Sequence, residues 1–140
     1  DAARAIVVEI GNSQLQAFKI EAPNTAAQPE YLFTTAGSTV GFALYRNAAV
    51  AAPNTSVITG IGNISGDIAL LRINGAQAAS SSADQGTGNY GNYPLYIGRR
   101  GGTTIPFNGR IYQLIVRGAE SNAGQIAAGE AYVNAKTRAF

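Results

Sequence analysis

Side chains suited to binding a sugar gather in one short stretch of the sequence, between residues 84 and 100. The C–H face of a sugar ring packs on an aromatic ring, and its hydroxyl groups hydrogen-bond to Asn, Asp and Arg side chains carried on loops. The candidate glycan-binding residues are Asp84, Asn89, Tyr90, Asn92, Tyr93, Arg99 and Arg100. A structural alternative stays open, in which the tyrosines cover sheet edges and the arginines flank a hairpin.

Groups that commonly catalyse reactions are scarce. Histidine and cysteine are absent, which excludes Ser-His and Cys-His nucleophile pairs, thiolate metal sites and a histidine proton shuttle. Two catalytic carboxylates on one strand need an even spacing, such as i and i+2, to point from the same face. None of the eight acidic residues is closer than eight positions to another. Acids from different strands could still meet, but we expect a non-catalytic protein.

Calcium is the one metal for which the sequence offers ligands. The ion takes about six to eight oxygen atoms, usually including several carboxylates. Asp67 and Asp84, with backbone carbonyls of residues 80–91, could form a weak site. The alternative is that both aspartates stabilise turns, and we therefore expect no bound cofactor.

Composition indicates one domain with a nearly neutral surface. At 140 residues the chain is about the size of a single domain and long enough to bury a core. Only 13% of the residues are charged, and the resulting surface of neutral polar groups suits neutral ligands. The net charge of +2 is spread without a basic cluster, so we expect no nucleic-acid binding. No apolar run reaches the roughly 18 residues of a membrane span, so we expect no membrane insertion.

Short apolar runs bounded by turn residues predict a chain built mainly from β-strands. Gly-Asn-Ser between the first two runs predicts a β-hairpin, and Asn74-Gly75 predicts another. The expected strands are residues 4–10, 14–20, 31–35, 40–45, 56–61, 67–73, 76–82, 95–99 and 110–116.

The connections are marked by proline, glycine and asparagine. Two prolines predict a loop at residues 21–29, and a Pro-Asn pair favours a loop over a helix at residues 48–55. Three glycines in residues 60–66 predict a turn. The polar loop at residues 80–92 is longer than most connections, and such loops are often functional or mobile.

One helix is expected, near the C-terminus. Ser121 can cap a helix over residues 122–136. Apolar residues close to helical spacing predict one buried face, made of Ile126, Ala127, Tyr132 and Val133. Many short strands followed by one terminal helix favour an all-β sandwich over an alternating α/β chain.

Four segments in this order resemble the C-terminal half of the concanavalin A-like, laminin G-like jelly-roll domains. They are DIALLRINGAQ, NYPLYIGRR, PFNGRIYQLIVRG and SNAGQIAAGEAYVNAKT, which together cover roughly residues 67–136. The resemblance implies an all-β fold, a two-sheet antiparallel β-sandwich with a short C-terminal α-helix. It also implies that residues 110–116 form a strand at the centre of a sheet. The residues expected in the core beside this strand are Phe107, Ile111, Leu114 and Val116.

A narrower resemblance concerns Ile-Gly-Arg-Arg, Pro-Phe-Asn-Gly and the terminal Glu-x-Tyr-Val-x-x-Lys-Thr. These are similar to modules of bacteriophage and prophage structural or tail proteins. The chain is short for a complete jelly roll and lacks the tryptophan common in the family's preceding strand. Further strands would therefore lie outside these residues or come from a neighbouring chain. We expect residues 1–140 to be a single domain, and a fragment or module of a larger chain.

The resemblance implies a non-catalytic, lectin-like module of a virion structural protein. In this hypothesis the module is extracellular, on the virion, and recognises carbohydrate on a host surface. The alternative is a structural virion module that contacts neighbouring subunits, without binding glycan, through its neutral surface and an open sheet edge. Contacts of that kind would also allow a homo-oligomer.

Overall fold

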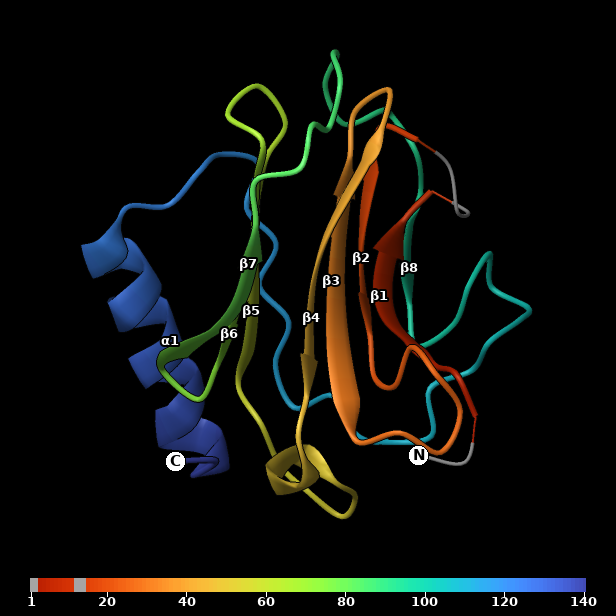
Figure 1. Cartoon of the computed structure of the whole chain (residues 1–140). Coiled ribbons are helices and arrows are strands. Elements are labelled where there is room, and N and C mark those ends of the chain that lie inside the picture. The colour runs from red at the N-terminus through yellow and green to blue at the C-terminus, as the bar shows by residue number, and fades with distance from the viewer. Residues whose placement is uncertain (1–2, 12–14) are drawn as a thin grey trace.

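The computed structural model of the protein describes residues 3–11 and 15–140. They form two antiparallel sheets and a C-terminal helix, which confirms the expected β-sandwich (Figure 1). Sheet A has the strand order β4-β3-β2-β1-β8, and sheet B has the order β5-β6-β7. The elements are β1 (Ile6–Ile10), β2 (Ala17–Glu21), β3 (Glu30–Ala36), β4 (Val40–Arg46), the short 3-10 helix η1 (Ala48–Val50), β5 (Ile58–Asn63), β6 (Ile68–Ile73), β7 (Ala76–Ser81), β8 (Leu95–Ile97) and α1 (Ala123–Thr137).

Sheet A starts with the first predicted hairpin. β1 and β2 pair antiparallel, with Glu9 opposite Lys19, whereas Asn12 and Ser13 of the predicted Gly-Asn-Ser turn lie outside the described part of the chain. β2 also pairs with β3, and β3 with β4. β8 is shorter than the predicted strand 95–99, because Gly98 takes a φ of +76° that ends the extended conformation.

Sheet B contains the second predicted hairpin, between β6 and β7. Asn74 and Gly75 have φ values of 51° and 82°, the positive pair that a two-residue hairpin turn requires. Residues 48–55 form a loop with one 3-10 turn and no α-helix, as predicted. The turn-forming residues therefore predicted this hairpin and this loop correctly.

The predicted turn at residues 60–66 is wrong in its first half, because Gly60 and Gly62 lie inside β5. A Cβ atom added to Gly60 would overlap the ring of Phe33 on the opposite sheet. One added to Gly62 would overlap Thr35. These glycines thus let β5 approach sheet A closely instead of reversing the chain.

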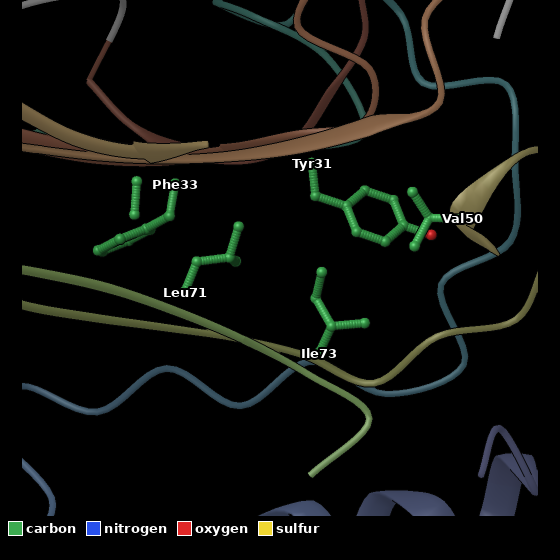
Figure 2. Packing of buried hydrophobic residues seen from close by; sticks show 6 residues of the cluster. Tyr31, Phe33, Val50, Leu71 and Ile73 are labelled. Atoms are coloured by element: carbon green, nitrogen blue, oxygen red, sulfur yellow. The ribbon is translucent and has the colours of Figure 1, made fainter. Parts of the chain in front are cut away.

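The main apolar cluster lies between β3 and β6. Tyr31 and Phe33 point from sheet A towards Leu71 and Ile73 of sheet B, and Val50 of η1 packs at one end of the cluster (Figure 2). The strand residues of the cluster occupy alternate positions, so each strand turns one face inward. Burial of this one face fixes the register of both sheets.

The expected central strand at residues 110–116 is absent from the fold. This segment is extended but belongs to no strand, and no backbone hydrogen bond joins it to another described segment. Of the residues expected in the core, Phe107 and Leu114 are half-buried, whereas Ile111 and Val116 are exposed. The prediction was wrong because strand-like residues form a strand only where an unpaired neighbour lies within hydrogen-bonding distance.

Helix α1 begins one residue later than predicted. Its cap is Asn122, which accepts a hydrogen bond from Gln125 N and completes a capping box with it, and Ser121 precedes the cap. The expected buried face is only partly confirmed. Its four members comprise the half-buried Ile126 and Val133 and the exposed Ala127 and Tyr132.

A buried ion pair, which the sequence did not suggest, attaches α1 to sheet B. Glu130 is the only buried residue of the helix, and its carboxylate accepts hydrogen bonds of 2.8 and 3.0 Å from Arg72 of β6. The side chain of Arg72 points away from the core, since its neighbours Leu71 and Ile73 point into it. The helix therefore covers the outer face of sheet B. No helix in the described residues is long and apolar enough to cross a membrane.

Candidate functional site

The predicted binding loop closes one end of the sandwich. The rim loop, residues 82–94, lies at the end where Figure 1 also shows the β3–β4 and β5–β6 turns. Backbone hydrogen bonds hold it there: Gly37 N donates to Gln85 O at 3.1 Å, Ser38 N to Thr87 O at 3.0 Å and Gly91 N to Gln16 O at 2.6 Å. These bonds fix the rim loop to the turns around it.

Gln85 anchors this loop, and the sequence analysis did not single it out. The residue is fully buried, its N–H donates to Asp67 Oδ1 at 2.8 Å, and its carbonyl accepts from Gly37 and Thr39. Its side chain packs over Gly41 of β4, where a Cβ would come within 2.8 Å of it. A glutamine in a polar loop carries no sequence signal for burial.

Tyr90 has a structural role. Its hydroxyl group lies 2.6 Å from Thr35 Oγ1, and its ring meets the edge of Phe18 at 5.6 Å between centroids. Burial raises the pKa of this phenol above its ordinary value, and the hydrogen bond with Thr35 only partly opposes the rise. Tyr90 thus packs one side of its ring against the end of the core while 37% of its surface stays exposed. The contacts with Thr35 and Phe18 match the structural alternative for this residue.

Three of the predicted residues are exposed on the rim loop and bind no other described side chain. We call them the rim patch: Asn89, Asn92 and Tyr93. Tyr93 is 36% exposed and its ring covers Gly91, where any Cβ would overlap it. Tyr93 N also donates to Gly91 O at 2.9 Å. Asn89 and Asn92 are exposed, and their side chains bind no other described residue. The rim patch therefore presents one positioned aromatic ring and two free amides.

The aspartates near this loop stabilise turns. Asp84 Oδ1 accepts from Gly86 N at 2.6 Å, and Asp67 Oδ1 accepts from Gln85 N. Within residues 3–11 and 15–140 no group of three or more acidic side chains could hold a metal ion. The Asp84 contact is that of a turn-forming aspartate, whereas the Asp67 contact joins its turn to the rim loop.

The two arginines lie away from the rim patch. Strand β8 separates Tyr93 from Arg99 (Figure 1). Gly11 N donates to Pro94 O at the end of β8 next to Tyr93, and Gly98 N donates to Val7 O at the end next to Arg99. Arg99 is exposed and binds no described side chain, whereas Arg100 is largely buried. The seven residues grouped by sequence are thus divided between opposite ends of sheet A.

Arg100 belongs to a buried network that sequence reasoning missed. Its Nε donates to both oxygens of Glu9 at 3.2 Å, and its Nη2 lies 3.6 Å from Glu21 Oε1. Glu21 also binds Arg4 at 2.5 Å and Lys19 at 2.9 Å, so both carboxylates are charge-paired. The antiparallel pairing of β1 with β2 sets Lys19 opposite Glu9, and this opposite-charge pair is the sequence signal that could have pointed to the cluster.

Glu30 forms a separate ion pair on the same face of sheet A. It is 2% exposed, and its carboxylate contacts Arg46 of β4 at 2.6 Å and the backbone N–H of Thr25. Burial disfavours its ionised form, but the hydrogen bonds from Thr25 and Arg46 and the charge of Arg46 outweigh burial. The pKa of Glu30 therefore lies below its ordinary value of 4.5.

This lowered pKa predicts a pH-dependent contribution to stability. A carboxyl group with a lower pKa in the folded state stabilises the fold above its unfolded pKa, and that stabilisation is lost as the pH falls through the folded pKa. Urea unfolding of the wild type and of Glu30→Gln should therefore differ at pH 7, and the difference should shrink as the pH falls below 4.5 and through the folded pKa. A difference in unfolding free energy that stays constant between these pH values would contradict the assignment.

Comparison of this chain with protein-family models, with curated proteins and with solved structures finds no match.

Proposed function

We propose that this β-sandwich is a non-catalytic, lectin-like module that binds carbohydrate through the rim patch. The observation that carries the proposal is the exposed ring of Tyr93, held over Gly91 on a loop fixed by backbone hydrogen bonds. A fixed aromatic ring binds with little loss of conformational entropy, since it is ordered before the ligand arrives.

The chemistry of the rim patch favours an uncharged sugar. The side-chain amides of Asn89 and Asn92 each offer donors and an acceptor, which match the hydroxyl groups of a sugar ring. No charged side chain belongs to the patch, and Arg99 and Arg100 lie at the far end of β8. The ligand class is therefore a neutral glycan.

The setting we propose is a phage or virion structural protein that meets carbohydrate on a host surface, outside the cell. Its support is the resemblance of the segments around Ile-Gly-Arg-Arg and Pro-Phe-Asn-Gly to modules of such proteins. A structural role in subunit contacts is the second candidate. It is favoured by the open edge of sheet B at β5, which pairs with no described strand other than β6.

Glycan-array binding tests the first proposal. Tyr93→Ala should weaken any array signal at least about tenfold, because truncation of a central aromatic contact typically costs more than about 1.4 kcal/mol. Asn92→Ala should weaken it less. Tyr132→Ala, which removes an exposed tyrosine from α1, is the matched control and should leave binding unchanged. A folded wild-type protein that binds no glycan, or one whose signal survives Tyr93→Ala, would exclude the rim patch as the site.

A further inference from the structure

Two asparagines of this chain, Asn74 and Asn108, are each followed by glycine, whereas every other asparagine precedes a larger residue. An Asn-Gly pair is prone to spontaneous deamidation. The backbone nitrogen of the glycine attacks the side-chain carbonyl carbon of the asparagine, and ammonia leaves as a succinimide ring closes. Water then opens the ring to aspartate or isoaspartate, so the amide and water become a carboxyl group and ammonia. Glycine favours the attack because it has no side chain to hinder its nitrogen and its dihedral angles are free.

Hydrogen bonds hold the side chain of Asn74 in place. This residue is half-buried, its N–H donates to Val57 O at 2.9 Å, and its Oδ1 accepts from Val57 N at 2.8 Å. The turn continues directly into β6 and β7, which pair from Ile73 and Ala76 onwards. The carbonyl group that the nitrogen of Gly75 would attack is therefore tied to the residue that precedes β5.

Gly75 is held from the other side. Its carbonyl accepts a hydrogen bond from Arg72 Nη2 at 2.5 Å, and the ring of Phe140 lies where a Cβ on this glycine would come within 3.1 Å of it. Phe140 is itself fixed, because its backbone N–H and C=O both bond to the side chain of Asn134 in α1. Closure of the succinimide ring changes the geometry of both residues of the pair. At this turn the reaction must therefore wait for a local opening that breaks these contacts.

The second pair, Asn108-Gly109, lacks these restraints. Asn108 and Gly109 are exposed, and neither forms a hydrogen bond with a described residue through its backbone or side chain. The chain is anchored just before the pair, where Phe107 N donates to Gly98 O at 2.8 Å. The ring of Phe107 also occupies the space that a Cβ on Gly109 would need. Packing therefore requires glycine at the position that makes the asparagine reactive.

The fold around Asn108 also tolerates the product. Isoaspartate continues the chain through its side-chain carbon, which lengthens the backbone by one atom. In a strand such an insertion disturbs the register, and with it the face that each following side chain occupies. Residues 108–116, however, form no backbone hydrogen bond with another described segment. The lengthened chain therefore breaks no described pairing.

We propose that Asn108 is a site of spontaneous deamidation in the folded protein and that the fold protects Asn74 from the same reaction. Each event at Asn108 replaces an amide by a carboxylate and lowers the formal net charge from +2 to +1. The new carboxylate arises two residues before Arg110, which is exposed and forms no ion pair with a described residue. The surface charge at residues 108–110 thus changes as the protein ages, while the fold persists. This proposal does not depend on the rim patch.

Peptide mapping by mass spectrometry tests the proposal, because deamidation changes the mass of the peptide that contains the site. The whole chain is incubated in mildly alkaline buffer, which deprotonates the attacking nitrogen, with and without denaturing guanidinium. In guanidinium the two Asn-Gly pairs should react at similar rates. In the native protein Asn108 should keep its denatured rate within about threefold, whereas Asn74 should react at least about tenfold more slowly than when denatured, which corresponds to about 1.4 kcal/mol for local opening.

Two variants of Asn108 complete the test. Asn108→Gln moves the amide one methylene farther from the backbone, so the charge change at this position should stop while the rate at Asn74 is unaffected. Asn108→Asp has the sequence of one product and should melt at the wild-type temperature, since the side chain is exposed. Native rates slowed equally at both pairs, or a faster native reaction at Asn74 than at Asn108, would overturn the proposal. So would an Asn108→Asp variant that fails to fold.

Discussion

Replacement of Arg100 by methionine is expected to lower the free energy of unfolding by about 3–5 kcal/mol, since it removes one partner from a buried ion pair. Glu9 is 1% exposed, so its carboxylate stays out of solvent when the guanidinium is lost, whereas Glu21 keeps its contacts with Arg4 and Lys19. Methionine keeps the length and apolar stem of the side chain, so the loss of charge dominates the effect.

The neighbouring arginine provides the matched control for this measurement. Arg99 is exposed and binds no described side chain, so Arg99→Met should change the unfolding free energy by no more than about 0.5 kcal/mol. Urea unfolding at pH 7 measures both variants. Equal effects of the two substitutions would show that the buried network does not stabilise the fold.

Leu71→Ala should lower the free energy of unfolding by about 2–5 kcal/mol. The side chain of Leu71 is fully buried and packs between the sheets beside Phe33 and Ile73 (Figure 2). Its removal leaves a cavity that two hydrogen-bonded sheets cannot easily close, because their spacing is fixed by the other residues of the cluster.

Ile68→Ala, on the same strand, is the control for this second prediction. Ile68 is 37% exposed, so its truncation should cost well under half as much. Guanidinium unfolding with a shared slope for all variants gives the comparison. A similar loss of unfolding free energy in both variants would mean that Leu71 does not lie in the core.

The arginine substitution also bears on the proposed carbohydrate site. The sequence placed Arg100 in the same candidate site as Tyr93. In the structure, Arg100 binds Glu9 at the other end of β8. Loss of glycan binding in Arg100→Met would therefore follow from unfolding, whereas loss in Tyr93→Ala would report on the ligand contact. Thermal melts of both variants separate these causes.

Local signals placed most of the strands and the helix correctly. Asn74-Gly75 needs positive φ at two positions, which few other residue pairs adopt, so the β6–β7 hairpin could be predicted from that pair alone. The alternation of buried positions in β6 likewise follows from the geometry of a strand with one covered face, whereas every residue of β3 is buried.

The errors arose where a neighbour distant in sequence decides the outcome. Residues 110–116 have the composition of a strand, but a strand also needs a partner, and none of the described segments supplies one. Gly60 and Gly62 are residues typical of a turn, but they lie in β5. Phe33 and Thr35 of the opposite sheet occupy the space that a side chain at these positions would need.

For the candidate site, the sequence by itself determined which side chains could bind a sugar. These are tyrosine and asparagine on a long polar loop, with few charges nearby. Only the tertiary structure decided which of these side chains remain free. Tyr90 is held by contacts with Thr35 and Phe18, and Arg100 is paired with buried glutamates, whereas the rim patch has no such side-chain contacts. The physical reason is that burial and ion pairing depend on residues that the strand order brings close together. These residues are far apart in the sequence, so the sequence alone does not show that they are neighbours.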